Sequence, residues 1–182
     1  MFYMFFADGF EEVEAIAALD VIRRAKIDIK SVGIGGKNIT GSHGITVVCD
    51  LLESEIAPSD SCDGIILPGG MPGTENLYNS DKVIEFVNYC KINGKFLCAI
   101  CAAPIILGRK NYLSGKKAVC FPGFEEELKG ASVSDSFVCR DGNIITAKGM
   151  GSAIEFGLQI AEELANPLEV KKIRASLQIY NG

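Results

Sequence analysis

Short apolar runs alternate with amphipathic segments along the whole chain, and this alternation limits the possible folds more than any other feature. The runs that are predicted to form buried strands are 2–7, 29–34, 64–67 and 96–100. Apolar residues recur at helical spacing within 11–25, 81–93 and 152–165. Strands that alternate with helices favour an α/β fold with a mainly parallel sheet.

Weaker signals fill the rest of the chain. We expect a strand at 45–50 paired near 38–39, a helix at 102–107, a strand at 118–121 and a helical turn at 124–128. Asp141-Gly142 predicts a hairpin turn between strands at 136–138 and 144–146. Asn166 followed by Pro167 predicts the start of a last helix.

Length and composition exclude several classes of protein. The 182 residues suit one domain, 1–182, and the 48% hydrophobic and 23% charged residues exclude a disordered chain. A net charge of -5 makes nucleic acid an unexpected partner. No apolar run approaches the ~20 residues that span a bilayer, so no membrane partner is expected.

The counts of seven cysteines and one histidine indicate the redox compartment of the protein and limit the metal sites that it can build. Residues 1–6 carry no basic residue of the kind that opens a secretory leader, so we expect free thiols in a reducing cytoplasm. One histidine cannot build a His-rich metal site, and no metal is expected.

Cys101 is the strongest candidate for a reactive residue. It follows the apolar strand 96–100 and precedes a helix, with the small residues Ala99 and Ala103 two places on either side. That arrangement is typical of a nucleophile elbow, and a helix N-terminus there would favour the thiolate. The alternative is a buried structural cysteine, the commonest state of a free cysteine.

The other six cysteines are interpreted as bystanders, five of them in the core and Cys62 in a loop where it could be exposed. A disulfide between Cys98 and Cys101 is not expected. Three strand residues span about 10 Å, whereas a disulfide needs Cα atoms within about 7 Å.

Glu14 lies on an apolar face of the first predicted helix, in line with Ala18 and Val21. Burial there would raise its pKa and make it a protonated hydrogen-bond donor. Favourable charge at a helix N-terminus is a sufficient explanation for Glu11 and Glu12 and an alternative one for Glu14. A second face holds Val13, Ile16 and Ala17 together with Asp20 and Arg24, which suggests that the helix also packs on a second subunit.

Glycines cluster after the strand 64–67, in residues 67–73 (LPGGMPG). They would let backbone N–H groups face an oxyanion, although an ordinary turn explains them equally well. His43 lies between Ser42 and Gly44 and is interpreted as a surface turn residue.

Together these segments resemble the ThiJ/PfpI family, in the branch of the Parkinson-disease protein deglycase and its bacterial-type members. The resemblance covers essentially the whole chain. It is carried by 8–14 (DGFEEVE), 20–25 (DVIRRA), 67–70 (LPGG), 99–104 (AICAAP), 121–123 (FPG) and 146–147 (TA).

The resemblance implies a flavodoxin-like three-layer α/β sandwich, a homodimer and no cofactor. By position, Cys101 matches the family's reactive cysteine and Glu14 the acid that hydrogen-bonds to it. The matching backbone donors around the site are Gly69, Gly70 and Ala102. Residues that match the dimer interface, or a basic position approaching the partner's site, are Asp20, Arg24 and His43.

Two departures from the family narrow the expected function. Phe121 stands where some members place a histidine near the cysteine, and Ala102 stands where the protease branch has histidine. Peptidase activity is therefore not expected. The expected function is cofactor-free and cysteine-dependent, a glyoxalase III or protein deglycase acting on reactive dicarbonyls or glycated protein. The alternative is an oxidative-stress sensor or chaperone that uses oxidation of Cys101.

Overall fold

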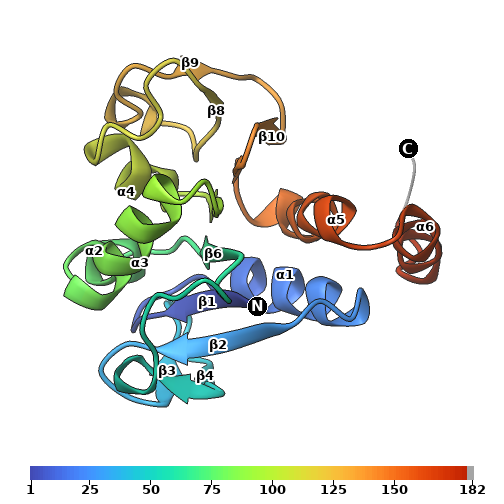
Figure 1. Ribbon diagram of the computed structural model, residues 1–182, viewed down its shortest axis with the longest axis horizontal. Helices are drawn as coiled ribbons and strands as arrows, with labels where there is room; N and C mark the ends of the chain where they lie inside the picture. Colours follow the sequence, from blue (N-terminus) through green and yellow to red (C-terminus); the bar gives the residue numbers. More distant parts are fainter. Residues whose placement is uncertain (180–182) are drawn as a thin grey trace.

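The computed structural model describes residues 1–179. In it, a seven-stranded sheet lies between two helical layers (Figure 1). All neighbouring strands are parallel except the β10–β11 hairpin at one edge. The predicted mainly parallel α/β sandwich is confirmed. Across the sheet the order is β10 (Val138–Asp141), β11 (Ile144–Ala147), β7 (Phe96–Ile100), β6 (Gly64–Leu67), β1 (Phe2–Phe6), β2 (Ile29–Gly33) and β5 (Leu51–Leu52).

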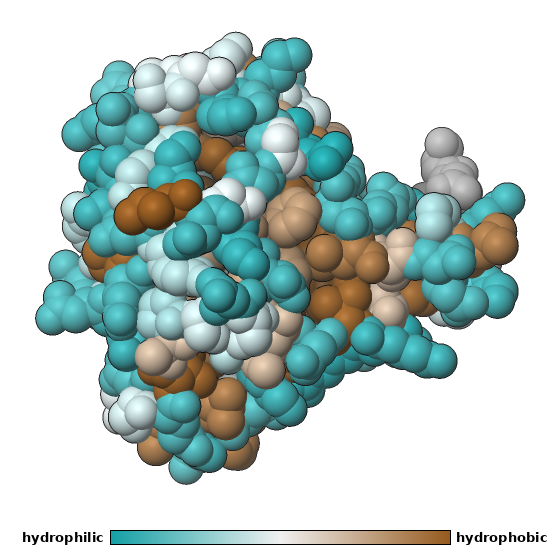
Figure 2. Space-filling model, viewed as in Figure 1, coloured by the Kyte–Doolittle hydropathy of each residue, from teal (hydrophilic) through white to brown (hydrophobic). Residues whose placement is uncertain are grey.

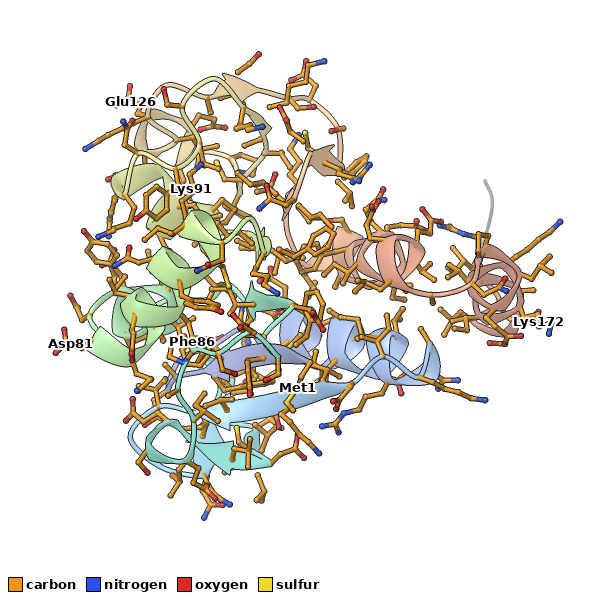
Figure 3. The ribbon with its side chains drawn as sticks, viewed as in Figure 1. Met1, Asp81, Phe86, Lys91, Glu126 and Lys172 are labelled. Carbon is orange, nitrogen blue, oxygen red and sulfur yellow. The ribbon has the colours of Figure 1, made fainter. Side chains whose placement is uncertain are left out.

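The central strand β1 is apolar throughout because both of its faces are covered. Phe2, Met4 and Phe6 pack into one layer, and Tyr3 and Phe5 into the other. On the second side, Phe86 points from α3 (Asp81–Ile92) to the strand (Figure 3), and its ring centroid lies 5.3 Å from those of Tyr3 and Phe5.

On the first face, α1 (Glu12–Arg24) packs against α5 (Ala153–Leu164), with α6 (Pro167–Ser176) beyond them (Figure 1). Gly157 permits the contact, since a Cβ there would lie 3.0 Å from the Val21 Cβ and 3.1 Å from the Ala18 Cα. The opposite face carries α2 (Gly73–Tyr78), α3 and α4 (Pro104–Arg109).

Smaller elements lie outside the main sheet. The expected pairing near residue 38 is confirmed as an antiparallel hairpin of β3 (Asn38–Thr40) with β4 (Thr46–Val48). A second small pair is β8 (Lys117–Ala118) with β9 (Ser132–Val133). Single 3-10 turns are η1 (Glu53–Glu55), η2 (Glu125–Glu127) and η3 (Met150–Ser152). Every helix within residues 1–179 is too short or too polar to cross a bilayer.

Several predicted boundaries were wrong for local reasons. The helix after Cys101 begins only at Pro104, because residues 101–103 form a turn closed by the Ala103 N–H and the Ile100 carbonyl. The strand at 118–121 ends at Ala118, since the next N–H donates to the Thr146 hydroxyl instead.

The hairpin near residue 141 is also displaced. The strand expected at 136–138 begins only at Val138 and continues to Asp141, which still pairs with Ile144. The turn therefore falls on Gly142-Asn143. Sequence patterns predicted neither α2 nor the two-residue strand β5, which are too short to show a period.

Candidate active site

Cys101 occupies a strained turn at the carboxyl end of β7. Its φ is 64°, in the left-handed region that non-glycine residues rarely adopt. The backbone is held on both sides, since the Cys101 N–H donates to the Ala147 carbonyl at 2.9 Å and the Phe121 N–H donates to the Cys101 carbonyl at 2.8 Å. This is the conformation that a nucleophile elbow requires.

Glu14 lies against the thiol from the first turn of α1. Its side chain is buried and hydrogen-bonds to Cys101 and to the Gly69 N–H, the latter at 3.1 Å. Gly69 leaves room for both groups, because a Cβ on it would lie 2.5 Å from the Cys101 Cβ and 2.5 Å from the Glu14 Oε2. The end of β6 thus positions acid and thiol together.

These two groups shift each other's pKa in opposite directions: Glu14 raises the pKa of Cys101, while the hydrogen bond with Cys101 lowers that of Glu14 in part. Burial raises the pKa of Glu14 to about 7, in the direction that its apolar stripe predicts. Burial and the nearby Glu14 charge raise the pKa of Cys101 to about 12. The pair therefore holds one proton between its two members from about pH 7 to about pH 12, and that proton belongs to the pair rather than to one atom.

The backbone donors divide between the two groups. Amides of Ala102 and Gly70 hydrogen-bond to the Cys101 sulfur and lower its pKa in part, while the Gly69 amide is used by Glu14. The expectation that a helix N-terminus makes the thiol acidic was wrong, because α4 starts three residues later and burial and Glu14 outweigh the two amides. Gly70 itself has a φ of 91°, which favours glycine.

Cys101 is the one cysteine of the seven that is not buried, and all seven are free. Cys62 lies in a loop, as expected, but its side chain is 0% exposed there and packs in the core beside α3. Cys98 lies on β7, buried against the α1 and α5 layer, and makes no disulfide with Cys101. Only Cys101 combines partial access with a paired acid.

An apolar cavity of about 290 Å³ opens beside this pair. Its wall includes Phe121, Phe137, Lys148 and Met150, and we call it the aromatic cavity. A Cβ on Gly149, also in the wall, would lie 3.3 Å from the Phe121 ring and 3.9 Å from the Glu14 Oε1. Sequence reasoning missed Phe137, Lys148 and Met150 as neighbours of the site. The one available signal was the predicted hairpin that returns the chain beside Cys101.

His43 lies in a different cluster within its own chain. The buried Glu12 carboxylate accepts hydrogen bonds from the His43 N–H at 2.7 Å and from the Ser42 hydroxyl, and it pairs with the His43 Nδ1 at 3.0 Å. Burial would raise the pKa of Glu12, but the His43 hydrogen bonds outweigh it and lower the pKa to about 2. Glu12 thereby ties the β3–β4 hairpin to the start of α1.

Oxygens of Glu11 and Glu12 and a His43 ring nitrogen lie within 4.8 Å of one another, close enough to share a cation. Both carboxylates already accept backbone hydrogen bonds, Glu11 from the Glu14 N–H at 2.7 Å. These bonds account for the cluster as part of the helix start.

The outer face of α1 leaves apolar side chains in water. Val13 is 48% and Ile16 41% exposed, near an exposed ion pair of 2.6 Å between Arg24 and Asp20. Ile154 is also exposed, on the neighbouring α5, and hydrophobic surface gathers where α5 lies (Figure 2). This face is the candidate for subunit contact.

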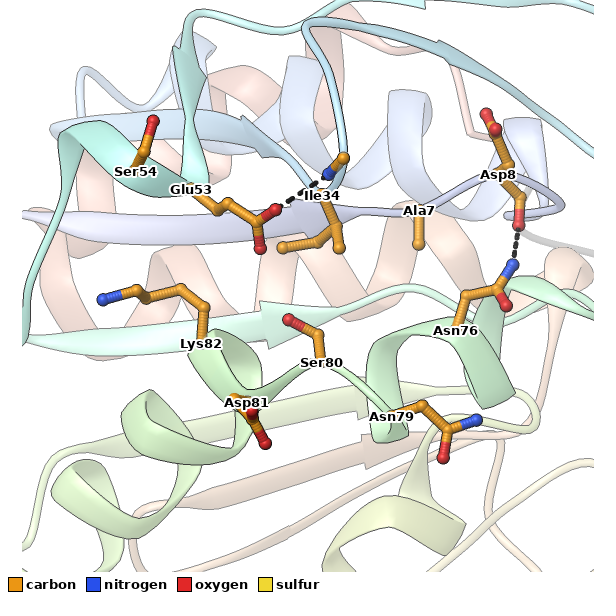
Figure 4. A pocket seen from close by; sticks show the side chains of 11 residues that line it. Ala7, Asp8, Ile34, Glu53, Ser54, Asn76, Asn79, Ser80, Asp81 and Lys82 are labelled. Carbon is orange, nitrogen blue, oxygen red and sulfur yellow. Dashed lines mark hydrogen bonds between the residues drawn. The ribbon is translucent and has the colours of Figure 1, made fainter.

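A second cavity, of about 740 Å³, lies at the carboxyl ends of β1 and β2 (Figure 4). Its side chains are mostly polar, and two hydrogen bonds cross its rim: the Gly35 N–H donates to Glu53 at 3.0 Å, and the Asn76 amide donates to the Asp8 carbonyl at 2.8 Å. No cysteine is among the described residues that line it, so it holds no thiol chemistry.

Comparisons with known proteins show the family and the fold of this chain. "Protein dj-1beta" of Drosophila melanogaster is 37% identical over 179 residues, covering 96% of this chain and 95% of that protein. A structure described as "Toxoplasma gondii DJ-1, oxidized" has a TM-score of 0.91 at 34% identity and covers 97% of this chain and 96% of its own. The crystal structure of Drosophila melanogaster DJ-1beta has a TM-score of 0.92 at 34% identity, with 98% and 97% covered.

These relatives share the flavodoxin-like fold over nearly the whole chain, while the bacterial-type assignment stays a prediction. The model of the DJ-1/PfpI family matches residues 2–163, which include the elbow and its acid. The chain therefore belongs to the DJ-1/PfpI family.

Proposed function

We propose that the protein is a cofactor-free, cysteine-dependent glyoxalase or deglycase that acts on reactive dicarbonyls such as methylglyoxal, or on their early protein adducts. The observation that carries the proposal is the pairing of the half-buried Cys101, on a strained elbow, with the buried carboxyl of Glu14. A thiol and a proton carrier in contact are what this chemistry needs.

In the first step the sulfur adds to the aldehyde carbon. The S–C bond forms as the C=O π bond breaks, and the shared proton passes to the new oxyanion, giving a thiohemiacetal. The amides of Gly70 and Ala102, which lower the pKa of the sulfur in part, are the backbone donors that would stabilise that oxygen.

In the second step Glu14, now a carboxylate, takes the proton from the aldehyde carbon. The pair of electrons left there forms a C=C bond as the neighbouring C=O π bond moves onto its oxygen, giving an enediolate. The proton then returns to the neighbouring carbon, and the hydroxyl proton of the thiohemiacetal carbon passes to the enediolate oxygen as the thioester C=O forms. The product is a thioester of Cys101, which one water hydrolyses to a 2-hydroxy acid and the free thiol. Glu14 serves as the proton carrier in each transfer, because its raised pKa lets it take and give a proton near neutral pH.

The test is lactate production from methylglyoxal. We expect Cys101→Ser to lose activity at least about a hundredfold and Glu14→Gln at least about tenfold, while the buried bystander variant Cys139→Ala keeps it. Equal rates for wild type and Cys101→Ser would refute the mechanism.

Oxidation of Cys101 is the second candidate function, and one observation favours it: a similar solved structure is described as "Toxoplasma gondii DJ-1, oxidized". A hydroperoxide would convert the thiol to a sulfenic acid with loss of water, and a second equivalent would give the sulfinic acid. The Gly70 and Ala102 amides could hold the new oxygens, together with protonated Glu14.

Intact-mass spectrometry after mild peroxide treatment tests this second function. One or two oxygens should appear on Cys101 before any other cysteine is modified. Equal modification of all seven cysteines would exclude a sensor built on this site.

We also propose a homodimer in a reducing cytoplasm, with neither nucleic acid nor membrane as a partner. The exposed Val13, Ile16 and Ile154 supply an apolar contact surface, and Asp20 and Arg24 a polar edge. The free state of the seven cysteines supports the cytoplasmic setting.

A further inference from the structure

Two large aromatic side chains stand in water beside the nucleophile. Phe121 is 47% and Phe137 70% exposed, and Met150, on the same wall, is 55% exposed. Isolated exposed apolar residues are ordinary, but three around one concave surface mark a binding site.

The aromatic cavity adjoins the elbow and its acid. Phe121 in its wall donates its backbone N–H to the Cys101 carbonyl. A Cβ on Gly149, in the same wall, would lie 3.9 Å from the Glu14 Oε1. Phe137 forms the other wall, with the Lys148 ammonium 5.8 Å from its ring centroid. The Lys148 N–H donates to the Phe137 carbonyl at 2.9 Å, which fixes the two residues to each other.

The size of the cavity suits one planar group. An apolar cavity of about 150 Å³ holds a benzene ring, and the aromatic cavity encloses about 290 Å³. Aromatic walls bind a ring by offset or edge-to-face contact. A small, fully hydrated dicarbonyl such as glyoxal would leave these walls uncovered.

We propose that the aromatic cavity binds an apolar, planar substituent of the electrophile that Cys101 attacks, with Phe121 and Phe137 as specificity-determining residues. Assigning that electrophile to the aryl-substituted 2-oxoaldehydes rests on the proposed function. The substituent would lie between the rings while its aldehyde carbon faces the sulfur.

Alkylation of Cys101 tests the cavity without any turnover. Iodoacetamide and N-benzyl-iodoacetamide react alike, since the sulfur forms an S–C bond as the C–I bond breaks and iodide leaves. We expect the ratio of their rate constants, benzyl over unsubstituted, to exceed that of free cysteine by about tenfold at Cys101. Phe121→Ala with Phe137→Ala should return the ratio to the free-cysteine value. Ile92→Ala, which removes an 80% exposed side chain from the end of α3, is the matched control.

Turnover of phenylglyoxal and glyoxal separates this inference from the proposed function. A raised alkylation ratio with no product from either dicarbonyl would refute the glyoxalase and keep the cavity. Product from both, with an alkylation ratio equal to that of free cysteine, would overturn the cavity and keep the glyoxalase. An unchanged ratio in the double variant, with a weakened dimer, would identify the cavity as a subunit contact and overturn the inference.

Discussion

The Gly69 amide donates to the Glu14 carboxylate at 3.1 Å, so the N–H at the end of β6 is used by the acid and not by the sulfur. The donors at the sulfur come from the next glycine and from the residue after the nucleophile. Acid and thiol thus have separate backbone donors, although both pack against Gly69.

Gly69→Ala should displace both members of the pair. The new Cβ would lie 2.5 Å from the Cys101 Cβ and from the Glu14 Oε2, and 3.0 Å from the Ile100 carbonyl, so the backbone itself must move. We expect a loss of about 1–3 kcal/mol in the free energy of unfolding, together with a fall in Cys101 alkylation. Urea denaturation and alkylation rates measure the two effects. Gly36→Ala, where a Cβ meets only the Asn38 carbonyl at 4.0 Å, should change neither.

Alkylation of Cys101 should follow the titration of the pair. The alkylation rate should rise through about pH 7, where the pair loses the first of its two protons, and again toward pH 12, where it loses the second. Glu14→Gln removes the charge beside the sulfur, so the step near pH 7 disappears and the pKa of Cys101 falls. A pH profile that is the same in wild type and Glu14→Gln would show that the two groups do not share a proton.

Glu14 should also make the fold less stable as pH rises. Its pKa is about 7 in the folded protein against an ordinary 4.5, so between these values the folded state binds more protons than the unfolded state. The resulting loss of unfolding free energy is roughly 3 kcal/mol across pH 4.5 to 7. Denaturation curves at stepped pH measure it.

The control for this stability effect is a pair of variants. Glu14→Gln should remove the decline of the unfolding free energy between pH 4.5 and 7. His43→Gln should not, because the pKa of His43 is raised above its ordinary 6.5 and its contribution is lost only at higher pH. A decline that persists in Glu14→Gln would assign it to other groups.

Charge on the outer face of α1 should dissociate the proposed dimer. Ile16→Asp places a carboxylate among apolar contacts, and we expect the dimer dissociation constant to rise at least about tenfold. Sedimentation velocity across a concentration series measures it. Val48→Asp, at a 76% exposed position on β4, is the matched control and should leave the dissociation constant unchanged. A wild-type protein that sediments as a monomer at every concentration would contradict the dimer.

The sequence predicted the features that follow from the periodicity of apolar residues or from small residues at fixed spacing. The order of strands and helices followed from periodicity, and Cys101 from its position after an apolar strand with alanines two places away. The apolar stripe through Ala18 and Val21 predicted the raised pKa of Glu14, because that stripe packs against Gly157 of α5.

What the sequence could not predict depends on particular hydrogen bonds, charges and contacts rather than on a repeating pattern. Helix α4 starts later than predicted because a turn at 101–103 is closed by its own hydrogen bond. The acidity expected for Cys101 was wrong because the balance of burial, one charge and two amides has no sequence pattern. Phe137 lies thirty-six positions from Cys101 and reaches the site only through β10, β11 and the turn that follows.

The two hydrogen bonds that clamp residue 101 join it to Ala147 on β11 and to Phe121 beyond β8. Neither partner belongs to the strand that carries the cysteine, and both lie toward the hairpin edge of the sheet. Local opening of that edge would let the elbow relax to an ordinary φ while the remaining strands stay paired. The reactivity of Cys101 therefore reports on this one edge of the sheet, and heat or denaturant should change it before the core unfolds.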